Sequence, residues 1–287
     1  MLTQFWILRL PLLQPASPAS LAARKLQSLL HDKIGSYTFV DFCAGAGGPT
    51  PYIEREINGS IKATDSHRHS QLNGVAGGND GQPEGVTFVL TDIFPHIPAW
   101  SRASAESESG RLSFVPTPVD ASRASKEVIQ LAKTTHEKGK SDDGDKMFRL
   151  FNLAFHHFDD ELATKILRNT LQTSDGFAIF ELQGRDVGNL FTVLMMTPII
   201  LLYSWWWFWG QWTALFWTYV IPVVPFVTVY DGVISCLRTR RPHEVMALLK
   251  KASADLDGQV DGWHFQVGEQ IHSWPTGTMS YFVGIKG

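Results

Sequence analysis

The sequence predicts an α/β protein with a mostly parallel sheet and helices on both faces. Two observations support this prediction. Short segments rich in aromatic and β-branched residues alternate with segments of helical periodicity, and a glycine-rich turn, AGAGGPT, directly follows the first short segment. Strands that alternate with helices form parallel sheets, because each helix returns the chain to the same edge of the sheet. The 287 residues are enough for one large domain or two small ones.

Each element is expected from its local sequence. Ser17 can cap a first helix, Pro18 suits its first turn, and Gly35 ends the segment. Residues 58–84 are rich in Gly, Asn, Ser, Asp and His with little hydrophobic pattern, so we expect a surface loop there. The other expected helices are 51–57, a charged segment after residue 121, and 159–171. The expected strands are 37–42, 86–90, 112–119, 147–155 and 176–182.

Polar and glycine residues collect where these strands end. Ligands of open α/β sheets bind at the carboxyl edge of the strands, so this distribution predicts a binding site there. In the turn after the first strand, Gly45, Gly47 and Gly48 would let the backbone approach a ligand closely. Asp92 could accept both hydroxyl protons of a ribose, and Asp120 could accept from the exocyclic amine of adenine.

Asp92 and Asp120 have alternative roles that stay open, whereas two other nucleotide-binding motifs are excluded by the residues in and after the glycine loop. Asp92 and Asp120 could instead cap helices or form turns, and Asp65 is a second candidate for the ribose. A nicotinamide fingerprint requires Gly or Ala where Thr50 stands, and no Gly-Lys-Ser/Thr follows the loop as a P-loop requires. The 25 basic and 28 acidic residues nearly balance, so no basic surface for binding nucleic acid is expected. The two cysteines and the histidine spacings predict neither a disulfide framework nor a metal site.

At this point the sequence resembles a known family. The segment from Asp41 to Thr50 is similar to motif I of class I S-adenosylmethionine-dependent methyltransferases, D-x-G-x-G-x-G, with Cys43 in place of the first glycine. The segments VLTDIFPH, PVDAS and LFNLAFHHFDD follow in the order found in a group of microbial and fungal class I enzymes. The last residues, WHFQVGEQIHSWPTGTMSYFVGIKG, are similar to the closing antiparallel strand pair of that fold. The resemblance extends over residues 37–286, apart from residues 58–84.

The resemblance implies a Rossmann-like fold with an antiparallel C-terminal strand, S-adenosyl-L-methionine as cofactor, and a set of binding residues. Asp41 and the loop at Gly45 and Gly47 would face the methionine moiety, Asp92 would hold the ribose, and Asp120 the adenine. The same resemblance adds Ala121 and Asn152 to the cofactor-binding set. It implies no metal.

Two histidines follow the fourth expected strand. His156 and His157 would lie beside the transferred methyl group, and a neutral imidazole can take a proton from a hydroxyl. Glu181, at the end of the fifth strand, is a second candidate for the base. One histidine could instead bond the backbone and only shape the pocket, and the sequence does not choose between the two. The expected reaction is O-methylation of a hydrophobic small molecule, possible in secondary metabolism.

The segment between Asp186 and Asp231 contains no Asp, Glu, Lys or Arg and is rich in tryptophan. We expect an apolar helical insertion that is either a monotopic or re-entrant pair, a two-span hairpin, or a lid over a pocket for an apolar acceptor. Arg238, Arg240 and Arg241 follow, where they could meet anionic headgroups. The first fourteen residues are also apolar but lack a basic flank, so we expect them to dock on the domain or on a membrane rather than form a cleaved leader.

The expected organisation has three parts. Residues 1–186 would form the N-terminal helix and the main part of the cofactor-binding domain, residues 187–235 the insertion, and residues 236–287 a C-terminal helix with the closing strands. Membrane contact through residues 187–230 predicts a membrane-associated protein with a cytoplasmic catalytic domain. The alternatives are a methyltransferase acting directly on a membrane lipid and a non-catalytic membrane-associated module, which cofactor binding would distinguish.

Overall fold

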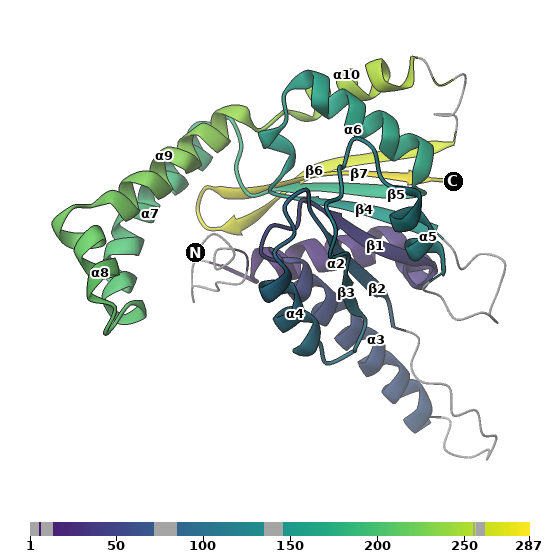
Figure 1. Cartoon of the computed structure of the whole chain (residues 1–287), viewed down its shortest axis with the longest axis horizontal. Coiled ribbons are helices and arrows are strands. Elements are labelled where there is room, and N and C mark those ends of the chain that lie inside the picture. Colours follow the sequence, from purple (N-terminus) through teal and green to yellow (C-terminus); the bar gives the residue numbers. More distant parts are fainter. Residues whose placement is uncertain (1–5, 7–13, 72–84, 135–145, 255, 257–261) are drawn as a thin grey trace.

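The computed structural model describes residues 6, 14–71, 85–134, 146–254, 256 and 262–287. Their centre is a seven-stranded sheet of order β3-β2-β1-β4-β5-β7-β6, in which β1 to β5 run parallel and β7 runs antiparallel to both of its neighbours (Figure 1). The predicted mostly parallel sheet with an antiparallel C-terminal strand is therefore confirmed. The strands are β1 (Tyr37–Phe42), β2 (Thr87–Thr91), β3 (Leu112–Phe114), β4 (Lys146–Asn152), β5 (Gly176–Glu181), β6 (Trp263–Ser273) and β7 (Gly277–Lys286).

Helices cover both faces of the sheet, as predicted. Successive strand residues point to opposite faces, so Phe39 packs in one hydrophobic core and Val40 in the other. The first core lies under α2 (Pro18–Leu30), α3 (Thr50–Gln71) and α4 (Ile97–Ala105). The second lies under α5 (Lys126–Thr134), α6 (Asp160–Thr173) and α10 (Pro242–Ser253).

Several element bounds differ from the sequence prediction. The loop expected at residues 58–84 is wrong over its first part, because α3 continues to Gln71, and residues 72–84 lie outside the described residues. Asn58 explains the difference: its amide donates to Val86 O at 3.0 Å and accepts from Val86 N at 2.7 Å, which ties the middle of α3 to the start of β2. Asp65 therefore lies inside a helix and not at a strand end.

Two other expectations need correction. The third strand ends at Phe114 rather than at residue 119, and the fourth ends at Asn152, after which Phe155–His157 form a 3₁₀ turn, η2. Helix α4 was not expected from the sequence. It begins after His96, whose ring nitrogen accepts from Ala99 N, and it is anchored by the fully buried Trp100.

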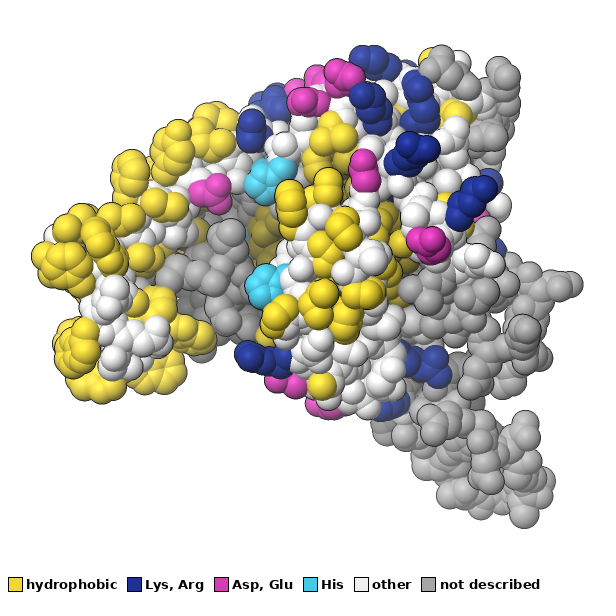
Figure 2. All heavy atoms as spheres, viewed as in Figure 1, with side chains coloured by type: hydrophobic (Ala, Val, Ile, Leu, Met, Phe, Trp, Pro, Cys, Tyr) yellow, Lys and Arg dark blue, Asp and Glu magenta, His cyan; other side chains and the backbone are white. Residues whose placement is uncertain are grey.

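The apolar insertion follows β5 and extends away from the sheet (Figure 1). It consists of α7 (Val187–Trp207), α8 (Trp212–Leu215), a π-helical turn η3 (Phe216–Val220) and α9 (Val223–Arg238). Helix α7 is long and apolar enough to cross a membrane, with only 22% of its most apolar window buried. The axis turns by 67° between residues 212–220 and α9. Apolar side chains gather over the surface of this insertion (Figure 2).

Candidate functional site

The glycine loop after β1 is held in a backbone conformation that needs glycine. Gly45, Gly47 and Gly48 have φ angles of 53°, 109° and 52°. Gly45 N donates to Asp92 Oδ2 at 2.8 Å, and Trp100 Nε1 donates to Gly45 O at 2.8 Å. Both contacts come from residues far away in the sequence, so β2 and α4 fix the loop from outside and leave its inner side free.

Cys43 stands at φ 75°, where the resembling pattern has glycine, and this conformation costs an L-residue about 1–2 kcal/mol. A β-branched side chain tolerates it less well. We expect Cys43→Val to lower the free energy of unfolding by about 2 kcal/mol, and Cys43→Gly, the matched control, to change it by less than about 1 kcal/mol. Urea denaturation measures both values. Equal destabilisation by the two variants would show that the positive φ of residue 43 is not the cause of the loss.

Asp41, at the end of β1, belongs to a buried polar cluster with Thr50 and Asn152. Thr50 Oγ1 and Asn152 Nδ2 both donate to Asp41 Oδ2, the latter at 3.3 Å, and Asn152 Nδ2 lies 3.1 Å from Thr50 Oγ1. Burial raises the pKa of Asp41 to about 7, although both hydrogen bonds oppose that shift. Asp41 Oδ1 and Asn152 Oδ1 have no hydrogen-bond partner among the described residues. Both atoms therefore keep acceptor capacity for a donor that arrives with a ligand.

Asp92 directly follows β2, as predicted, whereas Asp120 lies six residues beyond the end of β3 at Phe114, so its expected place at that strand end is wrong. Asp92 accepts from Gly45 N and, through Oδ1, from Phe94 N at 2.8 Å. A carboxylate has about four acceptor positions, so these two bonds leave room for ribose hydroxyls. Asp120 is exposed and accepts from Ser122 N at 2.8 Å, which is the turn-forming role weighed as its alternative.

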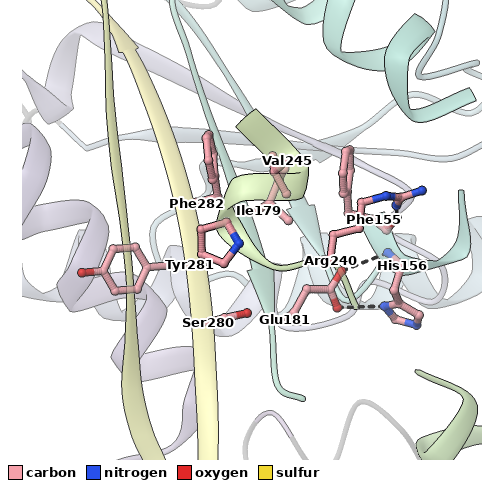
Figure 3. A pocket seen from close by; sticks show the side chains of 10 residues that line it. Phe155, His156, Ile179, Glu181, Arg240, Val245, Ser280, Tyr281 and Phe282 are labelled. Carbon is pink, nitrogen blue, oxygen red and sulfur yellow. Dashed lines mark hydrogen bonds and ion pairs between the residues drawn. The ribbon is translucent and has the colours of Figure 1, made fainter. Parts of the chain in front are cut away.

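His156 forms a buried dyad with Glu181 (Figure 3). Its ring Nδ1–H donates to Glu181 Oε2 at 2.8 Å, and its backbone N–H donates to Glu181 Oε1 at 3.1 Å. Gln183 Nε2 also donates to Glu181 Oε2, at 3.2 Å. A carboxylate on Nδ1 fixes the imidazole tautomer and leaves the Nε2 lone pair available as a base.

Two further histidines, His157 and His272, line the same pocket as His156. The His157 ring centroid is 4.1 Å from that of His156, and burial together with His156 lowers the pKa of His157. His272, from the end of β6, is buried, and its burial lowers its pKa to about 4. His157 makes no hydrogen bond to a carboxylate in the described part of the chain, so of these two adjacent histidines only His156 has a ring held by a carboxylate.

Arg240 clamps the turn that holds both histidines. Its Nη1 donates to Phe155 O at 3.1 Å and its Nη2 to Phe158 O at 2.7 Å, and Asp160 pairs with the same guanidinium at 2.8 Å. These two carbonyls lie on either side of His156 and His157. Arg240 follows the end of α9, so it joins the base of the insertion to the histidine turn.

We expect Arg240→Ala to lower the free energy of unfolding by about 3 kcal/mol, because it leaves two carbonyls and a carboxylate without their donor. Arg238→Ala is the matched control, since Arg238 is an exposed arginine two residues earlier. Urea denaturation of the two variants measures the difference. Similar values for both would contradict the clamp.

A cavity of about 850 Å³ joins the glycine loop to the insertion. Gly45, Asn152, His156 and His157, all predicted site residues, line it. Helices α7 and α9 and the β6–β7 turn form the opposite walls. Asp41 lies behind Asn152, whereas Asp92, Asp120 and Ala121 lie outside this cavity, along the strand ends toward β3.

The sequence did not point to several residues of this site. Thr50 was noted only as a departure from another motif, although it donates to Asp41 from the first turn of α3. Trp100, which donates to Gly45 O, lies on α4, and the sequence analysis did not predict that helix. Gly47 is in the loop but does not line the cavity. Among the described residues, no group of three or more His, Cys, Asp or Glu side chains is arranged to hold a metal.

No protein-family model matches the sequence, and no curated protein matches it. The structure is similar to the pyocyanin biosynthetic protein PhzM (TM-score 0.47, 13% identity, covering 94% of this chain and 56% of that one). It is also similar to a putative O-methyltransferase from Nostoc punctiforme PCC 73102 (0.43, 14%, 94% and 56%) and to the methyltransferase domain of bacterial CtHen1 (0.47, 9%, 94% and 97%). The chain thus spans a little over half the length of the first two.

These similarities are weak, so the chain's own topology decides its fold. Five parallel strands, a glycine loop after β1, and an antiparallel β7 between β5 and β6 are all present. The chain has a Rossmann-like fold with an antiparallel C-terminal strand pair, as predicted from the sequence.

Proposed function

We propose that this protein is an S-adenosylmethionine-dependent methyltransferase acting on a hydrophobic small molecule. The observation that supports this most is the glycine loop with Asp41 and Asn152 beside it, because two buried acceptor oxygens lack a partner next to a backbone that a ligand can approach. The α-ammonium and α-carboxylate groups of a methionine moiety match these acceptors and the loop N–H groups. Asp92 would hold the ribose, and Asp120 and Ala121 the adenine side.

The bound cofactor supplies an electrophilic methyl group on a sulfonium. The protein's own contribution is to align the acceptor with it and to remove the acceptor's proton. His156 is the base: Glu181 holds Nδ1–H, and Nε2 takes the hydroxyl proton. Glu181 then stabilises the imidazolium that forms. Apolar side chains of α7 in the cavity wall, including Phe191 and Met195, would contact the apolar part of the acceptor.

The test is isothermal titration of the purified full chain with S-adenosylhomocysteine, with NADH as the comparison ligand. We expect micromolar binding of S-adenosylhomocysteine and none of NADH. Glu161→Gln, an exposed acid on α6, is the control variant and should bind as the wild type does. If the folded protein binds NADH, or binds neither ligand, the proposal is wrong.

The insertion is the membrane-contacting part in this proposal. Helix α7 would be about 31 Å long at 1.5 Å per residue, close to the thickness of a bilayer core. The 67° bend before α9 favours a re-entrant or interfacial hairpin over two straight spans. The base of the same hairpin lines the cavity, so an acceptor dissolved in the bilayer would have a short path to His156.

Membrane contact is tested by changing three tryptophans at the far end, Trp206, Trp209 and Trp212, which are 65–73% exposed. We expect the triple Glu variant to lose co-flotation with phosphatidylcholine vesicles, because carboxylates do not enter the bilayer interface readily. Val267→Glu, at an exposed apolar position on β6, is the control and should still float with the vesicles. Unchanged flotation of the triple variant would leave the insertion as a lid only.

A further inference from the structure

The cavity between the glycine loop and the insertion is lined, among the residues the structure describes, by a single acidic side chain and by no Lys or Arg. Among the described residues that line it, Asp231 is the only Asp, Glu, Lys or Arg. Its carboxylate makes no hydrogen bond or ion pair within the described ranges of the chain. The facing wall on α7 is apolar and includes Phe191, Met195 and Ile199. Because no Lys, Arg or other acid shares the described lining, the Asp231 carboxylate is a recognition element for a cation.

Helix α9 turns its polar side toward this cavity. Thr228, Asp231 and Ser235 line the cavity and recur at positions i, i+3 and i+7, so they share one face of the helix. Phe226 and Tyr230 are 68% and 60% exposed and lie on the opposite face. Helix α9 therefore has an apolar outer face and a polar inner face. The inner face can bind a polar group in the cavity.

The close packing of α9 on α7 fixes the position of Asp231. A Cβ at Gly232 would lie 2.7 Å from Val193 Cγ1, so the two helices meet with glycine at the contact. Helix α9 also packs against the η2 turn, and the charge of Asp231 acts on His157. A group bound at Asp231 would therefore lie near the η2 turn that carries His156 and His157.

We propose that Asp231 binds a protonated amine of the acceptor, so that the acceptor is a lipophilic molecule with both an ammonium group and a methylatable group. That the bound amine is methylated rests on the proposed function, whereas the amine-binding site itself does not. The ammonium donates to the Asp231 carboxylate, and the apolar part lies against α7. A neutral molecule of the same shape loses this ion pair, and an anionic one is repelled.

The experiment compares three probes with one eight-carbon chain, octylamine, 1-octanol and octanoate, by calorimetric titration of the full chain in a nonionic detergent. We expect octylamine to bind about 10-fold more tightly than 1-octanol, and octanoate to bind most weakly. Asp231→Asn should reduce the first ratio to less than about 2-fold, and Asp231→Lys should make octanoate the preferred probe. Glu161→Gln, which removes a surface charge outside the cavity, should leave the ratios unchanged.

Titration with S-adenosylhomocysteine accompanies each variant. All three variants should bind it as the wild type does, because Asp231 lies on the insertion and not on the glycine loop. An octylamine preference that survives Asp231→Asn, or that Glu161→Gln also removes, overturns the amine site. Loss of S-adenosylhomocysteine binding in the wild type would overturn the proposed function alone, since the amine preference is measured without it.

Discussion

Asp41→Asn is expected to weaken cofactor binding strongly and at the same time to stabilise the free protein. The carboxyl of Asp41 is buried, and its pKa is raised from 3.8 to about 7. At pH 8 the folded protein therefore holds a desolvated charge at a cost of up to about 4 kcal/mol, at 1.36 kcal/mol per pKa unit. The amide removes this charge and keeps the contacts to Thr50 and Asn152. The same loss removes the partner of a ligand ammonium, which lowers affinity by about 100-fold.

The pH dependence has a defined sign. Between pH 4 and 7 the folded state of the wild type binds more protons at Asp41 than the unfolded state does, so its stability falls as the pH rises across that range. The difference in Tm between Asp41→Asn and the wild type should be largest at pH 8 and should shrink below pH 5. Differential scanning calorimetry and titration with S-adenosylhomocysteine measure both effects.

Glu54→Gln is the matched control, because Glu54 is a second buried carboxyl on the same face of the sheet. It accepts from Asn58 and Ser107 and lies away from the cavity. We expect it to leave S-adenosylhomocysteine affinity within about 2-fold of the wild type. A destabilised Asp41→Asn, or one that binds S-adenosylhomocysteine normally, would contradict the role given to Asp41.

His156→Asn and Glu181→Gln are expected to slow methyl transfer strongly without weakening cofactor binding. Removal of an oriented general base costs about 100-fold to 10,000-fold in rate. Loss of Glu181 alone should cost about 100-fold, because the ring loses its fixed tautomer and the partner of its charged form. Transfer of labelled methyl groups to a panel of apolar phenols and amino alcohols measures the rate.

His157→Asn separates the two histidines that the sequence could not distinguish. Its ring is adjacent to His156 but is not held by a carboxylate, so we expect a loss of less than about 10-fold. A larger loss for His157→Asn than for His156→Asn would make His157 the base. Titration with S-adenosylhomocysteine should give the wild-type affinity for all three variants.

Several elements of the fold follow from short segments of the sequence. The strand at residues 37–42 has the predicted bounds, and Ser17 caps the first helix through its side chain, which accepts from Ser20 N at 3.2 Å. Aromatic and β-branched runs and cap residues act over a few residues, so they can be seen without the rest of the chain. The glycine loop belongs to the same class, because its φ angles demand glycine wherever the loop lies.

Long-range contacts decided what the sequence left open. Asn58 extends α3 through a bond to Val86, and this places Asp65 in a helix and leaves Asp92 at the strand end. The choice between His156 and His157 depends on Glu181, 25 residues away in the sequence. The domain boundaries at residues 187 and 235, the membrane contact and the cytoplasmic location stay predictions.

The sequence by itself determined the alternation of strands and helices, the glycine loop and the uncharged segment 187–230, since periodicity, glycine spacing and charge content need no partner. Only the tertiary structure decided which polar groups face one another: Thr50 and Asn152 on Asp41, Glu181 on His156, and Asp231 on the cavity. The physical reason is that a hydrogen bond or a cavity wall joins residues from different strands and helices. The packing of the sheet and the insertion sets those distances, and no local pattern records them.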